Sequence, residues 1–180
     1  MFHEFRKKQA MTAIVLGVVA GVIASFAERA DAIITGGNAT PLGYVNTYTW
    51  ILVSASMFGL FGAIVTTEVQ ALVGLVTAAN PLSWLWPIIN LVFAAVVGVV
   101  SETVSRLRPK MKIHARLILL SFTCALLDIP LTYVVIVSVL GLPFKFYLLA
   151  LPFYIILQLA PSTIFSYAIL RAILRTSILD

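Results

Sequence analysis

Successive apolar runs, each about long enough to cross a lipid bilayer, constrain this chain more than any other feature. A membrane-spanning helix needs roughly 20 residues at ~1.5 Å per residue. Of the 180 residues, 61% are hydrophobic and only 11% are charged, and the mean hydropathy is +1.06. A soluble domain carries about 25% charged residues. Because the excess of apolar side chains must face lipid, we predict an all-α integral membrane protein in which residues 1–180 form a single transmembrane domain.

The apolar runs predict about six helices. Four of them are predicted at residues 10–27, 84–104, 115–140 and 145–174. The run from Tyr48 to Ala79 is too long for one untilted span. Its only polar interruption is Thr66-Thr67-Glu68-Val69-Gln70, so we predict two helices there, the second of them short, at about Glu68–Asn80.

The distribution of Lys and Arg supports this count and gives an orientation. Basic residues concentrate in cytoplasmic loops and near the cytoplasmic ends of helices. With six helices and a cytoplasmic N-terminus, only Arg29 and Lys145 fall outside, whereas five helices would place a basic cluster at Arg106–Arg116 or at the N-terminus outside. We therefore predict a six-transmembrane-helix bundle in the plasma membrane, with cytoplasmic N- and C-termini.

Small residues form a stripe along the first predicted helix. Ala13, Gly17 and Gly21 are four residues apart, and Ala20 and Ala24 lie beside them. Such a stripe lets another helix backbone approach closely. Two interpretations remain open, a docking surface for a partner protein and ordinary packing inside the bundle.

Asp128 is the most conspicuous candidate for ligand binding, because a charged group inside a membrane is costly and often functional. Ser121, Asp128 and Thr132 fall on one face of the same predicted helix, and Pro130 is expected to bend it. No Lys or Arg lies in the middle of any predicted span. The carboxyl is therefore expected to be protonated, hydrogen-bonded by a neighbour such as Thr132, Asn90 or Gln158, or paired with a donor on a ligand.

Aromatic and amide side chains at similar depth complete the predicted substrate site. Its candidate residues are Asp128, Asn90, Trp86, Tyr133, Tyr154 and Gln158. Aromatic rings that stack, together with a few hydrogen-bonding groups, suit a flat heteroaromatic ligand with polar edges. The alternative is that Asp128 and Gln158 only bond neighbouring helices, and that the rings form an interfacial aromatic belt.

No catalytic motif is present in the sequence. It contains no H-E-x-x-H, no G-x-S-x-G and no P-loop, and its two histidines, His3 and His114, are far apart in the chain. We therefore expect no enzymatic activity, no cofactor and no metal site.

The chain resembles the substrate-binding S-components of energy-coupling factor (ECF) vitamin transporters. The resemblance rests on the predicted topology, on the stripe Ala13-x-x-x-Gly17-x-x-x-Gly21, and on the stretch from Val69 to Val76 followed by Asn80-Pro81 and Trp84. In this family a small-residue surface on the first helix docks on the coupling subunit. Asn80 and Trp84 join the substrate-binding candidates.

This resemblance implies a bacterial or archaeal protein that captures a vitamin or vitamin precursor from outside the cell, and a thiamine-like compound is the candidate that Asp128 suggests. A coupling transmembrane subunit and two ATPase subunits, all separate chains, would drive release inward. The competing interpretation is a self-sufficient small secondary transporter or channel. Such a protein is expected to show internal repeats or a chain of ionisable groups, and neither is evident in the sequence.

Overall fold

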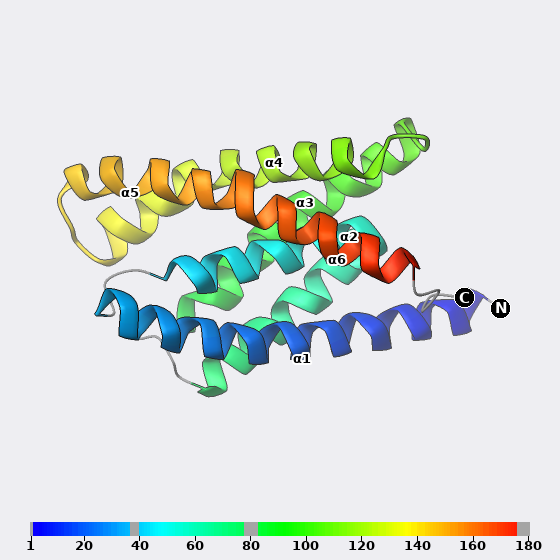
Figure 1. Cartoon of the computed structure of the whole chain (residues 1–180), viewed down its shortest axis with the longest axis horizontal. Helices are drawn as coiled ribbons and strands as arrows, with labels where there is room; N and C mark the ends of the chain where they lie inside the picture. The colour runs from blue at the N-terminus through cyan, green and yellow to red at the C-terminus, as the bar shows by residue number, and fades with distance from the viewer. Residues whose placement is uncertain (1, 37–39, 78–82, 176–180) are drawn as a thin grey trace.

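The computed structural model describes residues 2–36, 40–77 and 83–175, and it confirms an all-α fold over these ranges (Figure 1). Among the described residues, five helical stretches are long and apolar enough to cross a membrane. The helices are α1 (Phe2–Thr35), α2 (Pro41–Thr77), α3 (Trp86–Leu107), α4 (Ile113–Tyr133), α5 (Phe144–Leu157) and α6 (Thr163–Arg175). A 3₁₀ turn, Ser83–Leu85, precedes α3, and π-helical turns, Val134–Val139 and Gln158–Ser162, follow α4 and α5.

Helix α2 is two helical segments joined at Gly59. This glycine has φ 65° and ψ −148°, a conformation that L side chains rarely adopt. The carboxylate of Glu102 on α3 accepts the backbone N–H of Leu60 at 3.1 Å, which satisfies a donor at the start of the second segment.

The first segment, residues 41–58, runs antiparallel to α1. The amide of Asn46 donates to the carbonyl of Ala20 at 3.1 Å, whereas the N–H of Leu42 donates to Asp31, farther along α1. Residue numbers rise on one helix as they fall on the other, so the two helices point in opposite directions.

The second segment, residues 60–77, runs parallel to α1. Thr66 donates to the carbonyl of Ala13 at 3.1 Å, and the hydroxyls of Ser25 and Thr77 lie 2.9 Å apart. The chain therefore reverses direction at Gly59, as the cyan and turquoise halves of α2 show in Figure 1.

The polar interruption in this region does not break the helix, contrary to the sequence-based prediction. Thr66 bonds to α1, Thr67 bonds to the carbonyl of Ala63 one turn earlier, and Gln70 donates to Thr47 at 2.8 Å. Each of these three side chains makes at least one hydrogen bond inside the bundle, so the helix continues through them. The second segment consequently begins after Gly59 and not near Glu68, and residues 60–77 span about 27 Å at ~1.5 Å per residue.

The small-residue stripe of α1 packs against this second segment of α2. Its five residues are all buried: Ala13, Gly17, Ala20, Gly21 and Ala24. A Cβ at Gly17 would lie 2.6 Å from the carbonyl oxygen of Thr66, and one at Gly21 would lie 2.5 Å from the Cβ of Val73. Of the two interpretations left open for the stripe, the structure therefore supports packing inside the bundle, because α2 of the same chain occupies the stripe.

Proline reshapes the helix that ends the chain. Pro161 has no N–H to donate to the carbonyl of Leu157, and the helix widens into the π-helical turn Gln158–Ser162. The hydroxyl of Ser162 donates to that carbonyl at 3.1 Å. Helices α5 and α6 thus form one bent rod, which matches the single helix predicted for residues 145–174.

The two ends of the bundle differ in what they carry. Helix α1 begins, α6 ends and α3 turns into α4 at one end, which we call the termini end (Figure 1). Helix α1 ends, α2 begins and α4 connects to α5 at the opposite end, which we call the loop end.

Candidate functional site

A carboxyl group held by two phenols lies inside the bundle. The side chain of Asp128 on α4 is only 3% exposed, and it accepts hydrogen bonds from the hydroxyls of Tyr44 and, at 3.0 Å, Tyr48. Tyr44 and Tyr48 are one turn apart on α2, so both hydroxyls reach the same carboxyl. Among the described residues, no Lys, Arg or His pairs with it.

Aromatic rings from three helices surround this carboxyl. The ring of Tyr154 on α5 lies 4.7 Å from that of Tyr44, and the rings of Tyr44 and Tyr48 are 4.4 Å apart. Phe93 on α3 meets Tyr48 edge-on at 4.9 Å. We call Tyr44, Tyr48, Asp128 and Tyr154 the tyrosine–carboxyl cluster. It offers flat apolar faces beside a strong hydrogen-bond acceptor.

A second polar group lies one helical turn from this cluster, at the π-helical turn that follows α5. The side chain of Gln158 is fully buried beside the Cys124 thiol, and neither atom of its amide has a conventional hydrogen bond to a described residue. The backbone carbonyl of Gln158 accepts a hydrogen bond from the hydroxyl of Ser121 at 3.0 Å, and the hydroxyl of Thr163 donates to that of Ser121 at 2.8 Å. A buried amide without partners is uncommon in proteins, and π-helical turns often occur at functional sites.

Helix α3 and the second segment of α2 contribute further polar groups. The amide of Asn90 reaches the carbonyl of Thr67 at 3.5 Å, the long limit for a hydrogen bond. The indole N–H of Trp86 and the amide oxygen of Gln70 are buried without partners among the described residues. Phe93, which packs on Tyr48 of the tyrosine–carboxyl cluster, lies one turn from Asn90 on α3.

The structure brings some of the predicted site residues together and not others. Asp128 and Tyr154 lie in one cluster, with Gln158 one turn away. Tyr133 is 41% exposed and packs on Phe144 and Tyr147 toward the loop end, and Trp84 is 55% exposed. Asn80 lies outside the described residues.

The hydrogen-bond partners of Asp128 differ from those predicted. The sequence suggested a neighbour such as Thr132, Asn90 or Gln158 as one alternative, but the carboxyl bonds to Tyr44 and Tyr48. The predicted helix begins with the apolar run at Tyr48, so the sequence places Tyr44 before it, whereas α2 begins at Pro41 and carries both tyrosines. Their spacing of four residues, the period of one helix face, was the signal that would have identified them.

The position of the two tyrosines depends on a buried carboxylate at the end of α1. Asp31 is fully buried and accepts the backbone N–H groups of Leu42 and Gly43, at 3.0 and 2.9 Å. These N–H groups belong to the first turn of α2, where no earlier carbonyl of the helix is available. Asp31 thus caps α2 from another helix and fixes where it begins.

Replacing Asp31 with alanine is expected to destabilise the protein by about 0.5–2 kcal/mol, the typical effect of losing a helix cap. Asp31→Asn should have a smaller effect, because its amide retains one acceptor oxygen. Thermal unfolding in detergent, followed by circular dichroism, measures both. Equal stability of Asp31→Ala and the wild-type protein would show that the cap does not hold α2.

Comparison of this chain with protein-family models, with curated proteins and with solved structures found no match. Its candidate function therefore depends on the geometry described above. Within residues 2–36, 40–77 and 83–175, no three His, Cys, Asp or Glu side chains are grouped so that they could hold a metal ion.

Proposed function

We propose that this chain is the substrate-capture subunit of an energy-coupling factor importer in the plasma membrane of a bacterium or archaeon. In this proposal it binds a vitamin or vitamin precursor, with a thiamine-like compound as the first candidate, and carries out no chemical reaction. A coupling transmembrane subunit and two ATPase subunits supply the energy for transport. The residues that carry the proposal are those of the tyrosine–carboxyl cluster.

The chemistry of the cluster favours a flat ligand that bears an amino group or a positive charge. Asp128 has no basic partner among the described residues, so a cationic or amino-bearing ligand would supply the missing counter-charge. The ring faces of Tyr44 and Tyr154 suit stacking on a heteroaromatic ring. The unpartnered amide of Gln158 adds a donor and an acceptor for the polar edge of such a ring.

The proposal includes six membrane crossings with cytoplasmic termini. The reversal at Gly59 supports it, since the two segments of α2 then count as separate crossings. The basic residues of the α3–α4 connection and of α6 gather at the termini end, where the positive-inside rule favours the cytoplasm.

Reporter fusions test this topology. Fusions after Arg108 and Arg175 are expected to read cytoplasmic, and a fusion after Lys145 is expected to read external. If α2 crossed the membrane only once, Arg108 would lie on the opposite side from the N-terminus. An external signal after Arg108, with the N-terminus cytoplasmic, would therefore refute the six-crossing proposal.

Ligand titration tests the function itself. The purified protein in detergent should bind one member of a vitamin panel, with thiamine as the first probe. Quenching of tryptophan fluorescence measures this binding. Cells should accumulate that vitamin only when the coupling subunit and the ATPases are present. Uptake by vesicles that contain this chain alone, driven by an ion gradient, would favour a secondary transporter instead.

A further inference from the structure

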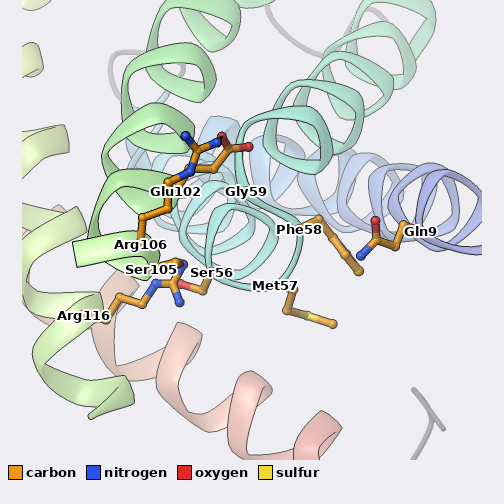
Figure 2. A pocket seen from close by; sticks show the side chains of 9 residues that line it. All are labelled: Gln9, Ser56, Met57, Phe58, Gly59, Glu102, Ser105, Arg106 and Arg116. Atoms are coloured by element: carbon orange, nitrogen blue, oxygen red, sulfur yellow. Dashed lines mark hydrogen bonds and ion pairs between the residues drawn. The ribbon is translucent and has the colours of Figure 1, made fainter. Parts of the chain in front are cut away.

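An open pocket of about 420 Å³ lies at the termini end (Figure 2), and its lining includes no residue of the tyrosine–carboxyl cluster. It is formed where α2 reverses, α3 ends and α4 begins, with α1 contributing one residue. Its lining combines basic, hydroxyl and apolar side chains: Gln9, Ser56, Met57, Phe58, Gly59, Glu102, Ser105, Arg106 and Arg116.

Arg116 is held rigidly at this pocket. Its Nη2 donates to the carbonyl and the hydroxyl of Ser101, at 3.0 and 2.7 Å, and to the hydroxyl of Ser105 at 2.5 Å. Its Nε–H is buried without a partner, and none of these bonds uses Nη1. Two serines on α3 therefore position the guanidinium and leave part of its donor capacity unused.

No described carboxylate neutralises Arg116. Glu102, the acidic residue in the lining, accepts the N–H of Leu60 with one oxygen and pairs with Arg106 at 3.7 Å through the other. The lining thus contains two arginines and one glutamate, an excess of one positive charge. A partly buried guanidinium without a counter-ion attracts an anion, because desolvation is compensated best by an opposite charge.

The remaining lining suits a phosphate group attached to an apolar chain. The hydroxyl of Ser56 is buried and has no hydrogen-bond partner among the described residues, and Ser56 lines the same pocket as Arg116 (Figure 2). Met57 and Phe58 line the same pocket. Because the pocket lies at the ends of the membrane-spanning helices, it is at the depth where lipid headgroups meet acyl chains.

We propose that this pocket binds the phosphate of an anionic phospholipid headgroup, with Arg116 as its principal ligand and Arg106 as a second, exposed one. Arginine pairs with phosphate through planar, two-pronged hydrogen bonds. Basic pockets between the ends of transmembrane helices are typical sites for such headgroups. The proposal does not depend on the substrate bound at the tyrosine–carboxyl cluster.

Native mass spectrometry of the detergent-purified protein tests the proposal. Phosphatidylglycerol is titrated against phosphatidylcholine, and inorganic phosphate is titrated separately with the melting temperature as the readout. The wild-type protein should bind phosphatidylglycerol more tightly than phosphatidylcholine. Arg116→Gln should lower the affinity for phosphatidylglycerol by about fivefold or more. A response to inorganic phosphate without any preference for the anionic lipid would identify a soluble phosphate compound as the source of the anion.

Arg171→Gln is the matched control, since Arg171 is an exposed arginine on α6 that does not line the pocket. It should leave the lipid preference unchanged. If Arg116→Gln does not yield folded protein, Arg106→Gln replaces it, because Arg106 is 81% exposed and its loss should spare the fold. Equal binding of the two lipids with no phosphate response, or equal losses in the pocket variants and Arg171→Gln, would overturn the proposal.

Discussion

Replacing Gly17 with leucine is expected to prevent α1 and α2 from packing, and so to abolish most of the folded protein. A Cβ at this position would already lie 2.6 Å from the Thr66 carbonyl oxygen and 2.7 Å from the Val69 Cβ. Even Gly17→Ala should destabilise the protein by about 1–3 kcal/mol, the usual range for an overpacked core. Leucine adds three further carbons at the same point, so its effect should be larger. Size-exclusion profiles and thermal unfolding in detergent measure both variants.

Gly74→Ala is the matched control on the facing helix segment. A Cβ there would meet nothing within 4 Å, and alanine is favoured over glycine inside a helix by about 0.5–1 kcal/mol. This variant should be as stable as the wild-type protein or more so. If Gly17→Leu instead folds normally and fails only in assembly with a coupling subunit, the stripe is a docking surface after all and the α1–α2 packing is wrong.

The sequence predicted the helical class and most helix positions, because apolar runs of membrane length have few alternatives. It misplaced the break inside the longest run. Polarity at Thr66–Gln70 suggested an interruption, but Thr66 bonds to α1 and Gln70 bonds to the first segment of α2. The reversal depends on the backbone of Gly59, and a glycine between Phe58 and Leu60 does not differ in sequence from one that packs inside a helix.

The candidate site was predicted only in part, for a similar reason. Asp128 was identifiable because a carboxyl within an apolar span is conspicuous by itself. Its partners Tyr44 and Tyr48 depend on where α2 begins, and that start is fixed by Asp31, a residue of another helix. Interactions between helices leave no local pattern, so the pairing required the structure.

Replacing Asp128 with asparagine is expected to weaken ligand binding by roughly 10- to 150-fold. A hydrogen bond to a charged group contributes about 1.5–3 kcal/mol, and 1.4 kcal/mol corresponds to a factor of ten in affinity. The amide retains an oxygen that accepts from Tyr44 or Tyr48, so the fold should persist. Titration of the purified variant with thiamine, or with whichever panel vitamin the wild-type protein binds, measures the change.

Two tyrosine variants separate a ligand contact from a structural hydrogen bond. Tyr48→Phe removes one donor to the carboxyl but leaves the aromatic ring, so it should alter affinity less than Asp128→Asn. Tyr133→Phe is the control, because Tyr133 packs near the loop end, outside the tyrosine–carboxyl cluster. The ligand affinity of this variant should match that of the wild-type protein. Unchanged affinity in Asp128→Asn would make Asp128 a structural acceptor for the two phenols. That result would also remove the reason to favour a cationic or amino-bearing substrate, because no other described group in the cluster carries a negative charge.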